Sequence, residues 1–195
     1  MNEPDIYLAS SSPRRQRLLE QIGVRFEQVE VEIKEMRQLE ETPEKFVVRM
    51  ALGKARAGWE FLGGGQRPVL GADTVLAIDG EVLGKPRNRE HGLIMLERLS
   101  GRCHDVLTGV ALVGERERFL VQTSHVTFRD VTPAERIAYW DTGEPADKAG
   151  AYGIQGIGSI FIKHLEGSYS GVMGLPLFET TALLASFGIQ VLDGV

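Results

Sequence analysis

The sequence predicts a single α/β domain over residues 1–195, built around an elongated mixed β-sheet with flanking helices. Segments typical of strands and of helices alternate along the chain, and several neighbouring strands are separated only by short turns typical of hairpins. The chain has no internal repeat, low-complexity segment or obvious linker. These features favour one sheet with both parallel and antiparallel pairs over a purely parallel one.

The first half of the chain has two start or stop signals that place its helices. Gly23 follows a helical pattern and is expected to end it, while Thr42 and Pro43 form a capping residue followed by proline at the first helical position. The expected elements are a strand, a helix, a strand and a helix, at residues 6–10, 14–22, 25–33 and 43–62.

In the second half, the nearly continuous apolar run of residues 69–78 indicates a buried strand. Asp79 and Gly80 predict a hairpin turn into a strand at residues 81–83. A capping box at residues 132–135 predicts the start of a helix. The other expected elements are a helix, two strands, a helix, a strand and a helix, at residues 88–99, 105–113, 118–129, 132–140, 159–164 and 175–187.

The composition restricts the classes of function. The net charge is −5 and no basic stripe is present, so a nucleic-acid polymer is not an expected partner. No window approaches the roughly 18 unbroken apolar residues of a membrane span, and the N-terminus does not read as a signal peptide. Cys103 is the only cysteine, which rules out an internal disulfide. We expect its thiol to be packed and the protein to be cytoplasmic.

Residues 10–15 read Ser-Ser-Ser-Pro-Arg-Arg at the expected junction of the first strand and the first helix. Free N–H groups and the positive end of the helix dipole point into such a junction and favour an anionic ligand. Arg14 and Arg15 add donors suited to phosphate oxygens, and Ser10 and Ser12 place hydroxyls beside them. A plain helix cap with solvated arginines is the alternative, and the pattern is not that of a P-loop.

Asp73 interrupts the apolar run of residues 69–78. A carboxylate in such a strand is costly to bury unless it is paired with a cation or holds a metal ion. An aspartate that caps a turn at the strand end is the alternative. The neighbouring Gly71 and Thr74 suit close approach of a ligand, which favours a functional role.

Two further segments are candidates for ligand contacts. Lys85 lies between glycine and proline in a tight loop, and Lys54 lies on the preceding long helix. If the two lysines converge they would neutralise a polyphosphate, although each alone is usually a solvated surface charge. Residues 147–156 are rich in glycine, which permits close approach to a flat ligand, and Gln155 offers a donor and an acceptor to a base edge. A flexible loop is the alternative.

Short motifs follow one another in a specific order over nearly the whole chain, at residues 8–15, 54–56, 71–75, 84–86, 99–106, 108–110 and 174–176. Together they resemble the Maf family, the septum-formation-inhibitor proteins that act as nucleotide pyrophosphatases. The resemblance implies a fold like that of inosine triphosphate pyrophosphatase, an elongated α/β domain with a central cleft, and a homodimer. Residues 147–156 are similar to the branch of the family that acts on dTTP and UTP.

The resemblance also implies roles for individual residues. The catalytic aspartate of the family falls on Asp73, and its lysines fall on Lys54 and Lys85. Residues associated with substrate choice fall on Arg14, Thr74 and Gln155. An acidic residue falls on Glu35, which with Asp73 would hold a divalent cation, Mg²⁺ or Mn²⁺. Lys34 stands where many relatives carry an acidic residue.

The implied activity is that of a nucleotide diphosphatase. It would hydrolyse dTTP and UTP, with CTP and modified pyrimidine nucleotides as further candidates, to the monophosphate and pyrophosphate. Housekeeping of the nucleotide pool and a link to cell-division arrest are the implied roles. A 7-methyl-GTP pyrophosphatase and a non-enzymatic, nucleotide-binding regulator of septum formation are the alternatives.

Overall fold

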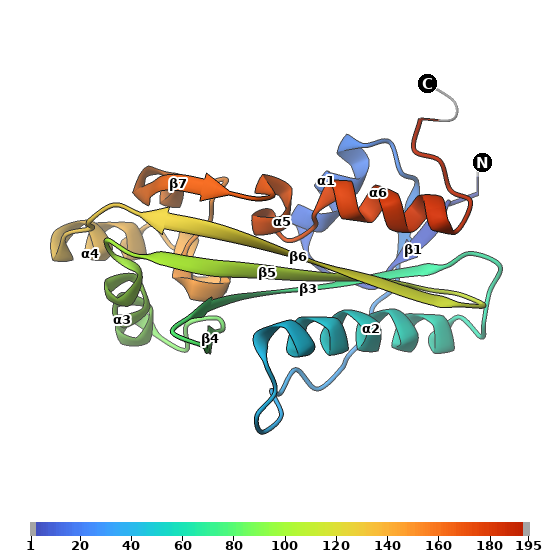
Figure 1. The fold of residues 1–195 in the computed structure, drawn as a ribbon, viewed down its shortest axis with the longest axis horizontal. Coiled ribbons are helices and arrows are strands. Elements are labelled where there is room, and N and C mark those ends of the chain that lie inside the picture. Colours follow the sequence, from blue (N-terminus) through green and yellow to red (C-terminus); the bar gives the residue numbers. More distant parts are fainter. Residues whose placement is uncertain (1–2, 193–195) are drawn as a thin grey trace.

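Figure 1 shows the elongated molecule, a computed structural model that describes residues 3–192. Three long antiparallel strands run along it: β3 (Val69–Ile78), β5 (Cys103–Val113) and β6 (Glu117–Phe128). Within these residues they form the centre of a seven-stranded sheet in the order β2-β1-β3-β5-β6-β7, and β4 pairs with β3 outside this path. The short strands are β1 (Ile6–Leu8), β2 (Phe26–Gln28), β4 (Glu81–Leu83) and β7 (Ile162–Glu166). Because β1 pairs in parallel with both β2 and β3, the sheet is mixed, as predicted.

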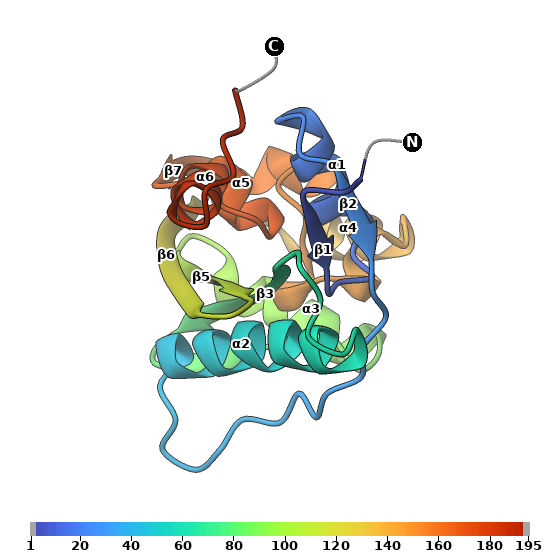
Figure 2. The same cartoon turned by 90° about the vertical axis from the view of Figure 1, so that its right-hand side faces the viewer.

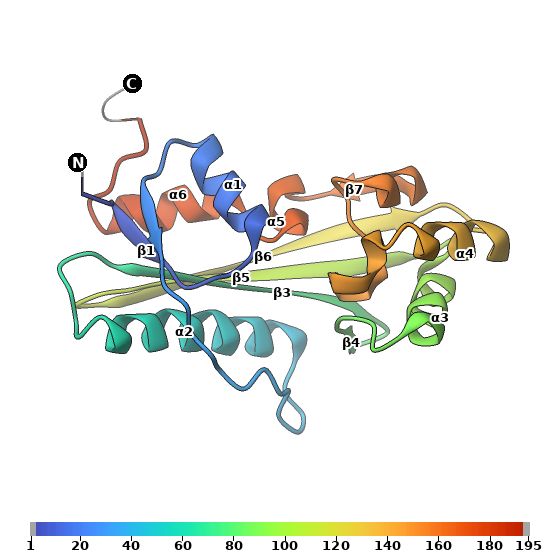
Figure 3. The same cartoon turned by 180° about the vertical axis from the view of Figure 1, so that it is seen from behind.

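Helices cover both faces of the sheet, as the end-on view in Figure 2 shows. The long helix α2 (Pro43–Phe61) lies along one face against β3 and β5. The opposite face is covered by α1 (Pro13–Gln21), α5 (Tyr169–Met173) and α6 (Leu177–Ser186). Toward the other end of the sheet lie α3 (Arg89–Leu99) and α4 (Pro133–Asp141) (Figure 3). The 3₁₀ turns η1 (Glu144–Asp147), η2 (Ala149–Ala151) and η3 (Ile157–Phe161) follow α4, and the last residue of η1 contacts α1. Within residues 3–192 no helix is long and apolar enough to cross a membrane.

Two glycines let α2 approach the sheet closely. A Cβ atom added to Gly71 on β3 would collide with the carbonyl oxygen of Ala51, and one added to Gly109 on β5 would lie 2.7 Å from that of Val47. These positions face α2, because side chains of a strand alternate between the two faces of a sheet. The close approach brings polar side chains of α2 within reach of β3.

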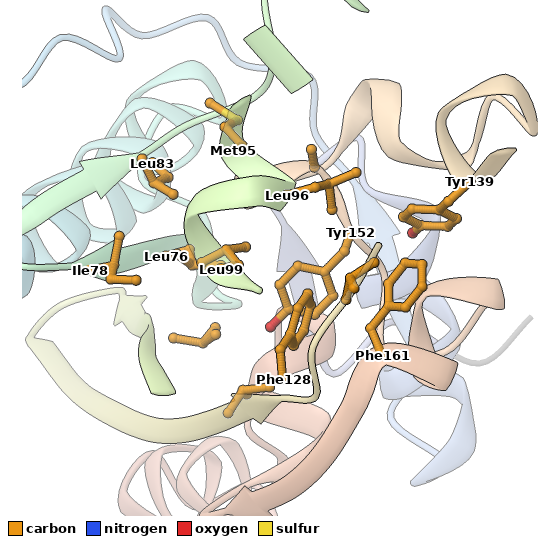
Figure 4. Packing of buried hydrophobic residues seen from close by; sticks show 14 residues of the cluster. Leu76, Ile78, Leu83, Met95, Leu96, Leu99, Phe128, Tyr139, Tyr152 and Phe161 are labelled. Carbon is orange, nitrogen blue, oxygen red and sulfur yellow. The ribbon is translucent and has the colours of Figure 1, made fainter. Parts of the chain in front are cut away.

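The face opposite α2 carries two apolar clusters separated by a polar row. Leu70 belongs to the cluster beneath α1 and α6, and Leu76 belongs to the cluster that Figure 4 shows near α3 and α4. Between the clusters, Thr74, Thr108 and Gln122 lie opposite one another in the register of β3, β5 and β6. Polar groups buried in such a row must find hydrogen-bond partners, so this row is a place where the sheet can position a ligand.

The strand predicted at residues 25–33 is wrong beyond its first residues. β2 pairs with β1 over residues 26–28 alone, because β1 is itself only three residues long and offers no further partner. The chain then leaves the sheet and runs beneath α2. The expectation of a packed thiol is also wrong, since Cys103 is exposed at the start of β5.

The strand predicted at residues 159–164 begins only at Ile162, because the residues before it form a 3₁₀ turn. The carboxylate of Glu144 accepts hydrogen bonds from the backbone N–H groups of Ile157, at 2.7 Å, and Gly158, at 3.0 Å, and thereby holds this turn. The short helix α5 was not predicted. Its five residues are too few to give a helical pattern in the sequence.

Replacement of Gly71 by alanine tests the close packing of α2. The added Cβ has no room against the backbone of α2, so we expect Gly71→Ala to lower the free energy of unfolding by roughly 1–3 kcal/mol, the usual cost of overpacking. Urea unfolding followed by circular dichroism measures it. Gly65→Ala, where an added Cβ meets nothing within 4 Å, is the control. Equal stability of the two variants would contradict the packing described here.

Candidate functional site

The edge of β3 is open between two short partner strands. β1 pairs with β3 as far as Leu70, and β4 pairs with it from Leu76 onward. Among the described strands, none pairs with residues 71–75 on this side, whereas β5 pairs with them on the other. Asp73 and Thr74 lie in the gap and, as neighbours in a strand, point to opposite faces of the sheet. The gap therefore leaves a nearly buried carboxylate and a partly exposed hydroxyl on opposite faces of a strand edge that no described strand covers.

On the α2 face, Lys54 bridges two carboxylates. Its Nζ atom donates to Oδ1 of Asp73 at 2.7 Å and lies 2.6 Å from Oε1 of Glu35. The side chains of Asp73 and Lys54 are 12% and 13% exposed, while that of Glu35 is 54% exposed. The bridge joins a strand, a helix and a loop, so three separate parts of the sequence converge on one ammonium group.

The pKa values of the two carboxylates shift in opposite directions. Burial raises the pKa of Asp73 above its ordinary value, although the charge and hydrogen bond of Lys54 and the charge of Arg15 oppose the rise. Burial alone would also raise the pKa of Glu35, but the hydrogen bond from Lys54 and the charges of Lys54, Lys85 and Arg15 outweigh it and lower that pKa. Asp73 is thus the better proton acceptor of the pair, and Glu35 is the more firmly ionised.

An ion pair holds the loop that carries Glu35 against α2. Arg49 on α2 donates through Nε to Oε1 of Glu41 at 2.6 Å and through Nη2 to the carbonyl oxygen of Met36 at 2.8 Å. The other carboxylate oxygen of Glu41 accepts from the backbone N–H of Gln38 at 2.9 Å. This loop, residues 29–42, runs beneath α2 in Figure 3. The pair therefore sets the position of Glu35 relative to Lys54.

On the opposite face, Arg15 is the central cation. It donates through Nε to the carbonyl oxygen of Gly174 at 2.8 Å, through Nη1 to Oγ of Ser10 at 3.2 Å, and through Nη2 to Oγ1 of Thr74 at 3.4 Å. Ser12 is the N-cap residue of α1 but its side chain makes no capping hydrogen bond. The hydroxyl of Ser10, just before the positive end of α1, thus lies close to the open edge of β3 through Arg15.

The remaining predicted residues lie around this centre. Lys85 is exposed after β4, and its charge acts on Glu35. Arg14 lies 3.6 Å from the carboxylate of Asp147, which joins α1 to the glycine-rich segment. Gln155 is exposed on that segment, and among the described residues no hydrogen bond joins it to the other candidates. The structure thus brings together Asp73, Lys54, Glu35, Arg15, Ser10 and Thr74, while Arg14, Lys85, Ser12 and Gln155 lie at the margins.

Sequence reasoning missed Thr108. Its hydroxyl donates to the carbonyl oxygen of Gly171 at 2.8 Å and lies 2.8 Å from the hydroxyl of Thr74. Thr108 is fully buried in the middle of β5. A threonine inside the apolar run of residues 105–113 was a usable signal, but only the register of β3 with β5 reveals that it faces Thr74.

Two hollows on the described surface are lined by other residues. One, of about 210 Å³, lies between α3 and α4, and the other, of about 330 Å³, lies beside the start of α2 and the turn after β3. Neither is lined by Asp73 or Lys54. The charged residues that can act on a ligand therefore converge at the strand edge and not in these hollows.

The fold and this site define a class: α/β proteins in which a buried carboxylate–lysine pair and an arginine meet at an unpaired edge of a mixed sheet. The chain belongs to the Maf family, because the model of the Maf-like protein family matches residues 5–187.

Similar curated proteins carry one name. The dTTP/UTP pyrophosphatase of Alkalilimnicola ehrlichii is 57% identical over 191 residues, which are 96% of this chain and 95% of that protein. The dTTP/UTP pyrophosphatase of Escherichia coli K12 is 50% identical over 184 residues, 93% of this chain and 92% of that protein. Among solved structures, the Staphylococcus aureus Ham1 protein gives a TM-score of 0.46 at 15% identity, over 63% of this chain and 71% of that one. This structural likeness is too slight to carry a conclusion.

The Glu41–Arg49 pair makes stability depend on pH. The hydrogen bond from Arg49 lowers the pKa of Glu41 from 4.5 to about 2. A carboxylate whose pKa is lowered by folding stabilises the fold fully above its unfolded pKa, and this contribution is lost as the pH falls through the folded value. We expect Glu41→Gln to lower the free energy of unfolding at pH 7. At pH 3 the free energies of unfolding of the variant and the wild type should differ by less.

Urea unfolding at the two pH values measures this difference. Glu40→Gln, at an exposed neighbour, is the control and should change little at either pH. A difference between Glu41→Gln and the wild type that is as large at pH 3 as at pH 7 would show that the ion pair is not its source.

Proposed function

We propose that this protein hydrolyses dTTP and UTP to the nucleoside monophosphate and pyrophosphate, as a housekeeping enzyme of the nucleotide pool. The observation that carries the proposal is the largely buried carboxylate of Asp73, which faces an open strand edge together with Lys54 and Arg15. The names of its relatives, dTTP/UTP pyrophosphatases of similar length, support the substrate. CTP as a poorer substrate than UTP, modified pyrimidine nucleotides and a link to cell-division arrest are further parts of the proposal.

The triphosphate would lie across the edge of β3 in the gap between its partner strands β1 and β4. Lys54 and Lys85 approach from the α2 side, and Arg15 approaches from the α1 side. The free N–H groups at the start of α1 and the hydroxyls of Ser10 and Ser12 suit phosphate oxygens. Several cations in a small space compensate a polyphosphate even though the whole chain is acidic.

A divalent cation, Mg²⁺ or Mn²⁺, is part of the proposal. The carboxylates of Asp73 and Glu35 approach one point, where they share the ammonium of Lys54. Magnesium in triphosphate sites is held by one or two carboxylates, with water and phosphate oxygens as the other ligands, so this donor set fits. Within residues 3–192 no group of three or more histidine, cysteine, aspartate or glutamate side chains is placed to hold a metal. When bound, the ion would neutralise phosphate charge and polarise a phosphate oxygen.

Asp73 would act as the general base. It accepts a proton from the attacking water, whose oxygen forms a bond to the phosphorus nearest the nucleoside while the bond to the bridging oxygen breaks. Pyrophosphate leaves with the electron pair of that bond, and no covalent intermediate is needed. The raised pKa of Asp73 suits the acceptance of a proton. Lys54, Lys85 and Arg15 offset the charge that accumulates on the phosphates during this step.

Recognition of the base would fall to the other face and to the glycine-rich segment. Thr74 offers a hydroxyl at the open edge, and Gln155 offers an amide from residues 147–156. Arg14, through its contact with Asp147, would hold this segment near the nucleotide. An amide can match both a donor and an acceptor on a pyrimidine edge.

A cytoplasmic homodimer completes the proposal. Phe178 and Phe119, which are 81% and 50% exposed, are apolar side chains that a second copy would cover. An exposed free thiol at Cys103 suits a reducing compartment.

Replacement of Asp73 by asparagine tests the catalytic assignment. The change keeps the shape of the side chain but removes the proton acceptor, so we expect turnover to fall by roughly a hundred- to a thousandfold. The folded state should be retained, because the buried ammonium of Lys54 keeps the carboxylate of Glu35 as a partner at 2.6 Å. Release of pyrophosphate from UTP in the presence of Mg²⁺ measures the rate.

Asp105→Asn on the neighbouring strand is the matched control. Its side chain is half exposed and pairs with His125, outside the candidate site, so this variant should retain normal turnover. An Asp73→Asn variant that keeps most of its activity would remove Asp73 from the mechanism.

The metal requirement is tested separately with Glu35→Gln. Loss of one carboxylate ligand should raise the Mg²⁺ concentration needed for half-maximal activity by at least roughly tenfold. Glu32→Gln, an exposed position in the same loop, serves as the control. Unchanged Mg²⁺ dependence in Glu35→Gln, or full activity of the wild type in EDTA, would contradict the assigned metal site.

A further inference from the structure

A chain of hydrogen bonds runs from Arg15 through two hydroxyl groups to the backbone of α5. Nη2 of Arg15 lies 3.4 Å from Oγ1 of Thr74, which lies 2.8 Å from Oγ1 of Thr108. Oγ1 of Thr108 lies 2.8 Å from the carbonyl oxygen of Gly171. Thr74 is partly exposed at the open edge of β3, whereas Thr108 is fully buried behind it. The hydroxyl of the partly exposed Thr74 is therefore bonded to a hydroxyl that is fully buried.

The direction of each bond follows from the two ends of the chain. A carbonyl oxygen can only accept, so Thr108 must donate its single proton to Gly171. Thr108 then has no proton left for Thr74, so the hydroxyl of Thr74 must donate to Thr108. A guanidinium can only donate, so Thr74 accepts from Arg15. The hydroxyl of Thr74 has thus used its proton and one of its two lone pairs, and it is left with one acceptor position.

Several contacts keep Thr108 from turning away. α5, which supplies the accepting carbonyl, is capped by Ser168, whose hydroxyl accepts from the backbone N–H of Gly171 at 3.0 Å. The residue that ends α5, Gly174, accepts from Nε of Arg15 at 2.8 Å. Two links therefore tie α5 to the same chain of hydrogen bonds. A buried hydroxyl that lost its partner would remain unsatisfied, which is costly, so the observed direction is strongly preferred.

We infer that Thr108 is a positioning residue that fixes the Thr74 hydroxyl as a hydrogen-bond acceptor toward the base, and that this selects pyrimidines with a proton on N3. Uracil and thymine carry N3–H, a donor that a fixed acceptor can bind. Cytosine has an unprotonated N3, which is itself an acceptor. It would face the acceptor oxygen of Thr74, and no hydrogen bond could form between them. The inference rests on the proposed function, because it requires that the base of the substrate contacts Thr74.

The preference between UTP and CTP is the direct measure of this role. In Thr108→Val, which has nearly the same shape, the Thr74 hydroxyl loses its acceptor and can turn its proton toward the ligand. We expect the ratio of kcat/KM for UTP to kcat/KM for CTP to fall by about five- to tenfold, which corresponds to one net hydrogen bond. Thr108→Ser retains the hydroxyl and should restore the wild-type ratio. A purely structural role would lower both kcat/KM values together and leave their ratio unchanged.

Thr74→Val is measured in parallel, so that the test does not depend on one buried substitution. It removes the acceptor itself and should lower the ratio by a similar factor. The double variant should match Thr74→Val alone, because Thr108 acts through Thr74. A wild-type ratio in Thr74→Val, or in a folded Thr108→Val, would overturn the inference while UTP hydrolysis by the wild type leaves the proposed function intact. A wild-type protein that hydrolyses neither nucleotide would overturn both.

Discussion

A carboxylate within an apolar strand is the constraint on which the rest of this structure depends. Asp73 is tolerated there because the ammonium of Lys54 lies 2.7 Å away, and burial of either charge without the other would be costly. Lys54 reaches the strand only because Gly71 and Gly109 allow α2 to lie close to the sheet. The packing of the long helix and the electrostatics of the candidate site are therefore set by the same few residues.

The unpaired stretch of β3, residues 71–75, divides the site into two surfaces with different chemistry. On the α2 face, carboxylates and lysines provide charge, which is what binding and cleavage of a polyphosphate require. On the opposite face, the row of hydroxyl and amide side chains between two apolar clusters provides directed hydrogen bonds, which are suited to discrimination among bases. Neighbouring residues of one strand, Asp73 and Thr74, supply one group to each surface. Under the proposed function, chemistry and selectivity would thus be altered separately, although the two residues are adjacent.

Much of the fold was predictable, because its main elements carry strong local patterns. The apolar run of β3, the cap at Thr42 and the capping box of α4 all appear where the sequence predicts them. The failures of such reasoning were the short elements, β2, β7 and α5, whose boundaries depend on partner strands and on contacts such as those of Glu144. The candidate residues at 73, 54 and 15 could be named from their types, but their convergence depends on register and helix approach. For the same reason Thr108 and the Glu41–Arg49 pair became visible only in three dimensions.

The central claim is that the open edge of β3 is where a pyrimidine triphosphate binds. A crystal structure of the protein with Mg²⁺ and a UTP analogue that cannot be cleaved between its first two phosphates tests it most directly. The account predicts that the phosphate nearest the nucleoside lies against Asp73 and Lys54, with the base on the side of Thr74. Density for the analogue in the hollow between α3 and α4, with residues 71–75 uncovered, would contradict the account.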